Sequence, residues 1–220
     1  MFEQTGIYIV SSILSNVKQL RDFSAVRKYL CCRLLNAQHS TDFLEEVPHR
    51  PFLDLAVVYD ICLPVSGEKH AAVPVTNTKA SDWDICEPQL FETALENMQR
   101  DCPPVLVPVS DLLEQSRSGL IFDSDALPLY VLTNRYKYFG AGTLLYAGIL
   151  QNFCDRAGDF YILPSSLHEV LLLPVSHAPS AEALNEIIRD VNRSHLDPAD
   201  FLSDHCYLYT AESRCIEQIF

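Results

Sequence analysis

The sequence predicts an α+β protein, built from antiparallel sheet with helices packed on one face and readable as two ferredoxin-like βαββαβ halves. Two patterns carry this prediction. Amphipathic stretches with helical spacing alternate with short apolar runs typical of strands, and a clear hairpin pattern stands in the second half. The composition agrees, because 48% hydrophobic and 20% charged residues are normal for a globular chain.

The clearest element is a β-hairpin at residues 160–175. Its two apolar runs, 160–163 and 170–175, are separated by a short polar link that begins at Pro164, and so short a link permits only a tight reversal. The second run is apolar at every position, so both of its faces must be covered. We therefore expect it to be a central strand.

The first half is expected to contain two amphipathic helices, a hairpin and two further strands. Its helical stretches repeat apolar residues every three or four positions, and its strands are rich in Val, Ile, Leu and Tyr. In chain order the predicted elements are a helix at 6–20, a strand within 26–35, a helical turn at 40–47, a hairpin of 53–63 with 70–76, a helix at 87–100, a strand at 105–109 and a helical turn at 111–115.

The second half reads strand, helix, strand, strand, helix, strand, which is the order of the ferredoxin-like split βαβ unit. Its elements are a strand at 129–133, a helix at 143–156, the hairpin, a helix after Ser180 and short strands at 207–209 and 215–220. The buried stripe of the last helix is predicted to consist of Leu184, Ile187, Ile188 and Val191.

The domain organisation follows from this order. Residues 1–115 are predicted to be an N-terminal α+β half, 116–127 a linker and 128–220 a C-terminal ferredoxin-like half. The stretch from 26 to 109 can be read in the same order of strands and helices, so the two halves are expected to be similar in fold.

The charge pattern argues against nucleic acid and membranes as partners. The net charge is −13, and acidic residues are spread over both halves. Binding to phosphate backbones or anionic lipid needs clustered Lys and Arg, which this chain lacks. Glu3 is the only charged residue before the first apolar run, so we expect no basic secretory leader. We therefore expect a cytoplasmic, soluble protein.

The eight cysteines are predicted to be free thiols in a reducing compartment. No pair has the two-residue gap of a zinc knuckle or a redox motif, and Cys31, Cys32, Cys62 and Cys154 stand in apolar runs as small buried hydrophobes would. Near the C-terminus, adjacent His and Cys side chains would point to opposite faces of a strand. We therefore expect no metal and no cofactor.

Several stretches together resemble domain-of-unknown-function family 5688. They are LYVLTN at 129–134, the Gly-Ala pair at 140–141, LLY at 144–146, the hairpin at 160–175, LSDH at 202–205, VPH at 47–49 and LDLAVV at 53–58. The resemblance covers about residues 22–210 and implies a bacterial protein, mainly of gut Firmicutes. It implies no reaction, because the family has no established activity.

The hairpin turn offers one catalytic hypothesis. A serine there would be activated by a histidine that an acid orients, with candidates Ser165, Ser166, His168, Glu169, Asp204 and His205. Neighbours on one tight turn rarely reach this geometry, and no Gly-x-Ser-x-Gly elbow is present. We favour the interpretation that the serines build the turn and that His168 and Glu169 bond local backbone groups.

A second hypothesis is an anion site at Gly140, Gly142 and Thr143, between a strand and a helix start. A third glycine and a phosphate-binding Lys are missing, so we favour a flexible helix start with Thr143 as its cap.

Two carboxylates, Asp54 and Asp60, stand in or beside an apolar strand, where an unpaired charge would be costly. We expect them to pair with Arg27, Lys28 or Arg33; the alternative is a functional carboxylate with a perturbed pKa.

The sequence thus favours a non-catalytic binding or regulatory module for a protein or a small molecule. One alternative is a hydrolase that uses Ser165, Ser166 and His168. Another is an inhibitor, encoded by an accessory or mobile element, that acts by protein contact. A further alternative is self-association through an exposed sheet edge.

Overall fold

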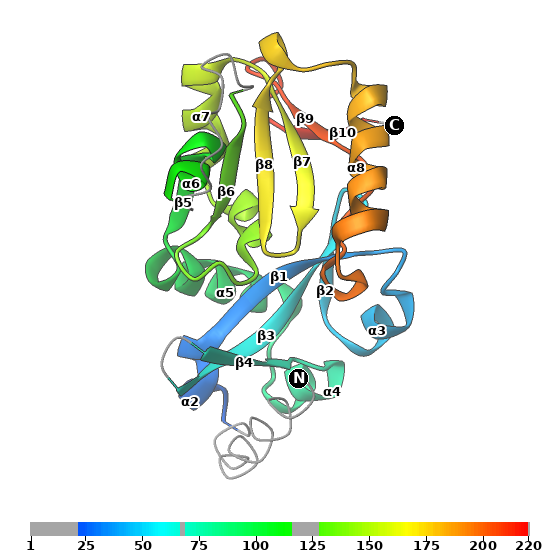
Figure 1. The fold of residues 1–220 in the computed structure, drawn as a ribbon. Coiled ribbons are helices and arrows are strands. Elements are labelled where there is room, and N and C mark those ends of the chain that lie inside the picture. Colours follow the sequence, from blue (N-terminus) through cyan, green and yellow to red (C-terminus); the bar gives the residue numbers. More distant parts are fainter. Residues whose placement is uncertain (1–21, 67–68, 116–127, 220) are drawn as a thin grey trace.

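The computed structural model describes residues 22–66, 69–115 and 128–219, and it confirms an α+β protein with two antiparallel sheets (Figure 1). The helix predicted at 6–20 and the linker predicted at 116–127 lie outside the described residues. The division into two halves stays a prediction.

The first sheet is built around one long strand, β3 (Leu55–Ser66). β1 (Leu30–Asn36) lies along one side of it, while β2 (His49–Phe52) and β4 (Lys69–Pro74) follow one another along the other side. Residues of β1 alternate between buried and half-buried, because one face of the sheet packs against α5 (Glu87–Asp101). Shorter helices flank it: α2 (Phe23–Val26), η2 (Arg27–Tyr29), α3 (Thr41–Glu46) and α4 (Asn77–Asp82).

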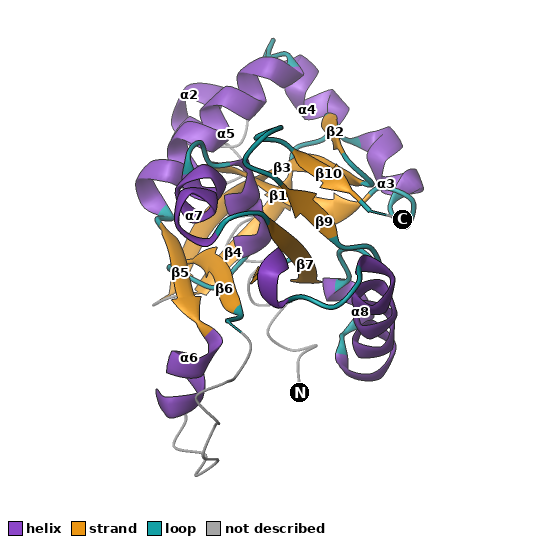
Figure 2. Ribbon diagram, turned by 90° about the horizontal axis from the view of Figure 1, so that it is seen from above, coloured by secondary structure: helices purple, strands orange, loops and turns teal. Residues whose placement is uncertain are grey.

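The second sheet has six strands in the order β10-β9-β7-β8-β6-β5. They are β5 (Pro104–Pro108), β6 (Tyr130–Asn134), β7 (Phe160–Ser166), β8 (Glu169–Pro174), β9 (Tyr207–Tyr209) and β10 (Ile216–Gln218). The helices of this part are α6 (Val109–Gln115), η3 (Gly140–Leu145), α7 (Ile149–Ala157), η4 (Val175–His177), α8 (Ala181–His195) and η5 (Pro198–Asp200). Viewed from above, α7 and α8 stand on opposite sides of β7 (Figure 2).

The predicted hairpin is confirmed as β7 and β8, and β8 lies inside the sheet between β7 and β6. Val170 and Leu172 belong to the main core on one face, and Leu173 packs with α8 on the other. Both faces are therefore covered, as the uninterrupted apolar run predicted. Val175 lies beyond the strand and is 39% exposed.

The structure does not confirm ferredoxin-like halves. The unit β6-α7-β7 with β8 between its strands is present, but β9, the last strand of the predicted unit, pairs with β7 and not with β6. The reason is that β5 already occupies the free edge of β6. Because β5 comes from the stretch predicted to complete the first half, that stretch forms no second ferredoxin-like unit.

Two predicted helices differ from the observed ones. The stretch at 143–156 is divided into η3 and α7, and Gly148 stands between them with φ +81°. In α8, Leu184 and Ile188 are buried, but Ile187 and Val191 are 54% and 48% exposed. The buried side of α8 includes a polar residue instead, because Asn185 is buried and accepts a hydrogen bond from Cys206 N at 2.7 Å.

The segment η3 joins the two sheets. Its Gly140 approaches β6 and the β7–β8 turn so closely that a Cβ would lie 2.1 Å from Thr133 Oγ1 and 2.2 Å from the carbonyl oxygen of His168. Those two atoms are themselves hydrogen-bonded, with the hydroxyl donating at 2.7 Å. Two residues later, Gly142 faces the end of the Met98 side chain and the Cys32 carbonyl. Only a residue without a side chain fits at position 140, between Thr133 and the carbonyl of His168.

We expect Gly140→Ala to lower the free energy of unfolding by about 3 kcal/mol or more, because its methyl group meets backbone and a bonded hydroxyl that cannot move aside. Gly142→Ala is the matched control in the same segment. Its methyl would lie 3.1 Å from Met98 Cε, a flexible end, so the cost should stay below about 1.5 kcal/mol. Urea unfolding measures both, and equal losses would contradict the close contact at Gly140.

Candidate functional site

A cavity of about 210 Å³ lies beside β1 and is the candidate site. Its walls come from three separated stretches, 28–32, 97–102 and 134–139, together with Cys62. This cavity could not be predicted from the sequence, because no single stretch carries a binding motif. The one local signal is the aromatic cluster at 136–139 directly after a strand.

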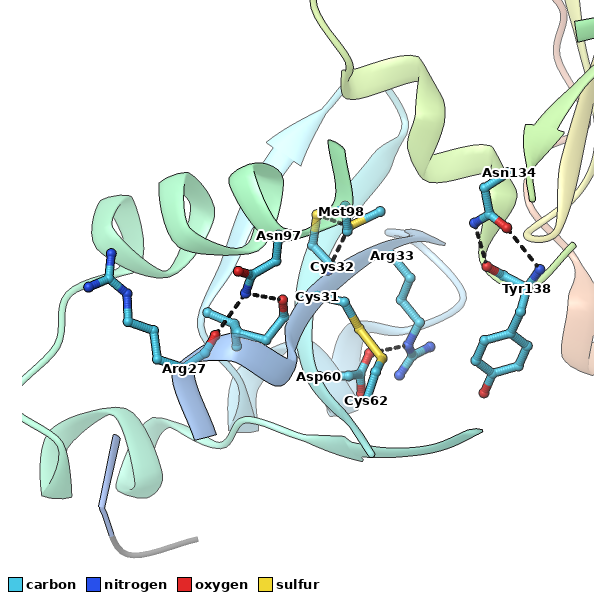
Figure 3. Close-up of a disulfide and its surroundings, with 11 residues drawn as sticks. Arg27, Cys31, Cys32, Arg33, Asp60, Cys62, Asn97, Met98, Asn134 and Tyr138 are labelled. Carbon is cyan, nitrogen blue, oxygen red and sulfur yellow. Dashed lines mark hydrogen bonds and ion pairs between the residues drawn. A yellow bond between two sulfur atoms is a disulfide. The ribbon is translucent and has the colours of Figure 1, made fainter. Parts of the chain in front are cut away.

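The floor of the cavity is the outer edge of β1, and α5 supplies partners for that edge. Asn97 Nδ2 donates to the Leu30 carbonyl at 2.9 Å and to the Arg27 carbonyl at 2.7 Å. The Cys32 N–H donates to Met98 Sδ at 3.2 Å (Figure 3). Two consecutive side chains of one helix thus satisfy an edge strand that would otherwise present unpaired backbone groups.

The aromatic wall is held by Asn134, the last residue of β6. Its Oδ1 accepts from Tyr136 N at 2.9 Å, and its Nδ2 donates to the Tyr138 carbonyl at 2.8 Å. Lys137 and Phe139 both adopt left-handed backbone, with φ 52°, which costs free energy for residues with a side chain. Because this tight segment is fixed at Asn134, the rings of Tyr138 and Phe139 lie together, 4.0 Å apart between centroids.

A disulfide between Cys31 of β1 and Cys62 of β3 also lines the cavity (Figure 3). The prediction of eight free thiols is therefore wrong for these two residues, while Cys32 and Cys154 are free and buried as predicted. The pairing depends on the register of β1 with β3, in which Cys31 lies opposite Asp60 and Cys62 follows on the same face. The spacing of the cysteines along the chain gives no information about that register.

The thiols near the cavity are weak acids. Burial raises the pKa of Cys32 to about 12, and the charge of Asp60 adds to this effect. Burial also raises the pKa of Cys102, which is half-buried on the cavity wall, and Asp101 contributes in the same direction. Both therefore stay protonated at neutral pH.

Asp60 forms a buried ion pair next to the disulfide. Its carboxylate is fully buried, and Oδ2 accepts from Arg33 Nε at 2.7 Å, which confirms the predicted pairing with Arg33. The other oxygen, Oδ1, has no hydrogen-bond partner among the described residues. Burial raises the pKa of Asp60, and Arg33 opposes this shift.

Asp54 has different partners from those predicted. Its carboxylate accepts from Ser203 Oγ at 2.6 Å and from Tyr207 OH at 2.7 Å, so the prediction of a basic partner is wrong here. Both hydroxyls belong to the part of the chain that forms the second sheet and its connections. Asp54 thus links the β2–β3 turn of the first sheet to residues far away in sequence.

The residues of the catalytic hypothesis are bonded to turn and backbone groups. His168 Nδ1 accepts from Phe139 N at 3.1 Å, and Nε2 lies 3.4 Å from Asp200 Oδ1. The Ser166 hydroxyl accepts from the backbone N–H of His168 at 3.0 Å. Within the described part of the chain, no hydrogen bond joins Ser165 or Ser166 to the imidazole.

The remaining candidates of that hypothesis lie elsewhere. Asp204 accepts from Asn192 Nδ2 at 2.8 Å, and the backbone N–H of His205 donates to Ser203 Oγ at 3.1 Å. Glu169 is half-buried at the start of β8. The acid beside His168 is thus Asp200 and not Asp204, and the catalytic role of this set stays a hypothesis.

The glycine segment also has its polar groups engaged. Ala141 N donates to the Leu167 carbonyl at 3.3 Å, Gly142 N donates to the Phe139 carbonyl at 3.1 Å, and Thr143 Oγ1 donates to the Gly140 carbonyl at 2.7 Å. Thr143 lies inside η3 and does not cap α7. An anion site at Gly140, Gly142 and Thr143 stays a hypothesis.

No three or more His, Cys, Asp and Glu side chains in the described ranges are grouped so that they could hold a metal ion. None of the helices described has the length and apolar character needed to span a membrane.

Comparison with known proteins gives one match. The model of DUF5688, described as a family of unknown function, matches residues 7–211. No curated protein and no solved structure matches the chain.

The buried ion pair predicts a pH dependence of stability. The folded pKa of Asp60 lies above its ordinary value of 3.8. Its contribution to the unfolding free energy is therefore fully present below that ordinary value and is lost as the pH rises through the folded pKa. The unfolding free energy of the wild type minus that of Asp60→Asn, measured by urea unfolding, should fall as the pH rises from 3.8 through the folded pKa of Asp60.

Asp101→Asn is the matched control for this measurement. Arg100 lowers the pKa of Asp101 by an exposed hydrogen bond, so its contribution has the opposite sign: it is present above the ordinary pKa and is lost as the pH falls. The slope should be small because the pair is exposed. A wild-type minus Asp60→Asn difference that rises with pH would contradict the burial of Asp60 as the dominant effect.

Proposed function

The chain belongs to the DUF5688 family, and we propose that it acts as a non-catalytic binding module for a small, largely apolar molecule with one or two rings. The observation that carries the proposal is the cavity beside β1, with aromatic rings and sulfur atoms on its walls and more apolar than polar surface. Such a concave site, fixed by secondary structure on several sides, is the usual form of a small-molecule site.

The size of the cavity limits the ligand. Its volume of about 210 Å³ exceeds the roughly 150 Å³ of an apolar cavity that admits benzene. It is smaller than the roughly 300–1,000 Å³ typical of sites for drug-sized molecules. A compound with one or two rings, either free or as part of a larger molecule that projects outward, matches this range.

The chemistry of the walls favours an apolar ligand. The amides of Asn97 and Asn134 line the cavity, but they are bonded to the backbone of β1 and of the aromatic segment. Wall groups that have already found partners offer a ligand mainly surface contact, which suits apolar and aromatic surface.

Two groups could recognise a polar substituent at the mouth. Tyr138 is 37% exposed, and burial of the rest of the ring, together with the charge of Asp60, raises its pKa. Its hydroxyl therefore stays protonated and can donate a hydrogen bond. The Lys28 ammonium lies 4.9 Å from the Tyr29 ring centroid and could attract an anionic substituent.

The hydrolase alternative has less support. His168 and Ser166 are engaged in the turn by backbone partners, which is the arrangement expected of a structural turn. Action as an inhibitor by protein contact, and a cytoplasmic location, both stay predictions.

We expect indole, used as a neutral bicyclic probe, to bind the purified protein in isothermal titration calorimetry. Tyr138→Ala should weaken binding by about tenfold, because it removes a ring from the wall. Val175→Ala is the matched control: this residue has nearly the same exposed fraction, 39%, but lies outside the cavity, so indole affinity should be unchanged.

A cavity-filling variant tests the location of the probe. Cys102→Phe places a ring in the cavity from a half-buried wall position and should abolish indole binding while circular dichroism shows an intact fold. If indole bound the wild type and this variant equally, or bound neither, the proposed function would be wrong.

A further inference from the structure

The Cys31–Cys62 disulfide is exposed to the interior of the cavity. Both cysteines line it, and both are half-buried rather than buried. We propose that this disulfide is a modification site for low-molecular-weight thiols that reach it through the cavity. Such a thiol would open the bridge and remain attached to one of the two cysteines as a mixed disulfide.

The fold does not depend on the bridge for the pairing of the strands it joins. β1 and β3 are already paired along seven consecutive positions, from Leu30 opposite Ile61 to Asn36 opposite Leu55. The outer edge of β1 is held independently by Asn97 and Met98. Opening the disulfide therefore lowers stability but leaves the sheet hydrogen bonds and the cavity walls in place.

The other cysteines do not compete for this role. Cys32 is fully buried, and its thiol lies 3.5 Å from Met98 Sδ. Cys102 shares the cavity but has a raised pKa, so it is a poor internal nucleophile. Cys86 and Cys215 are exposed and remain free thiols. The bridge is thus the one oxidised pair among eight cysteines, and a thiol from outside is the expected reactant.

The exchange needs no oxidant or reductant beyond the thiol. The thiolate sulfur of the small molecule attacks one cysteine sulfur, the Sγ–Sγ bond breaks, and its electron pair leaves on the other sulfur as a thiolate, which takes a proton from water. One disulfide is consumed and one is formed. A second molecule of the thiol can then displace the first, which leaves two protein thiols and a small-molecule disulfide.

The adduct would occupy the space that the indole probe occupies. Modification and binding at the cavity should therefore exclude one another, and this coupling rests on the proposed function. The exchange itself requires only that the disulfide be reachable through the cavity.

The test uses 2-mercaptoethanol as the thiol. Protein purified without reductant is incubated with this thiol in the absence of oxygen, and the reaction is quenched with acid. The mass of the intact protein is then measured by mass spectrometry under denaturing, non-reducing conditions. Free thiols do not combine with a thiol when no oxidant is present, so an adduct reports opening of the bridge. We expect an adduct that maps to Cys31 or Cys62, with an unchanged circular dichroism spectrum.

Two variants and one larger thiol sharpen the result. Cys62→Ser has no bridge and should give no adduct, whereas Cys102→Ser keeps the bridge and should react as the wild type does. Glutathione, a bulky tripeptide thiol, should react several-fold more slowly than 2-mercaptoethanol with folded protein, after both rates are normalised to the denatured protein.

Three results would overturn the proposal: alkylation of all eight cysteines in the unreduced, denatured protein, adducts that form only after denaturation, or unfolding that accompanies the exchange. Added indole separates the two proposals. Exchange that indole slows supports both of them. Exchange in a protein that does not bind indole supports the modification site and rejects the proposed ligand class.

Discussion

The backbone of Gly140 lies against Thr133 of β6 and the carbonyl of His168 in the β7–β8 turn, and no side chain fits between them. This contact determines where η3 begins. The five residues 135–139 must then turn back sharply from the end of β6, with two of them in left-handed backbone. His168 holds the last of them by accepting a hydrogen bond from the N–H of Phe139. The aromatic wall of the cavity is the outcome of that constraint.

The same contact places η3 between the two sheets, and hydrogen bonds between polar side chains and distant residues hold the sheets together. Asn36, at the end of β1, donates to the Leu202 carbonyl at 3.0 Å, and the Asp54 carboxylate binds two hydroxyls from the C-terminal part of the chain. Hydrogen bonds to a charged, half-buried acceptor are among the stronger ones in proteins. A cavity with walls from both parts of the molecule can keep its shape because these links hold those parts together.

The elements that could be predicted from the sequence are those that short-range patterns of residues determine. The hairpin of β7 and β8, the position of β8 inside its sheet, and α5 with Pro88 in its first turn all follow from local periodicity and turn chemistry. The buried apolar cysteines Cys32 and Cys154 were recognised for the same reason.

What sequence reasoning missed depends on contacts between distant residues. Whether β5 completes the first sheet or the second is decided by its pairing with β6, and the Cys31–Cys62 bridge by strand register. The partners of Asp54 lie about 150 residues away, as the sequence separations of 149 and 153 show. Ile187 and Val191 satisfy the helical period but are exposed. The cavity combines three such distant stretches and therefore has no local motif.

By bonding the outer edge of β1, α5 limits the pairing of that edge with other chains in a crowded solution. An edge strand with open backbone groups is a template on which another chain can add a strand, and such addition is a common first step of aggregation. Here a carboxamide and a thioether close that template at Leu30 and Cys32. The last turns of α5 therefore protect the molecule from its own sheet edge, and fraying of that helix end would expose the backbone groups of Leu30 and Cys32 to other chains.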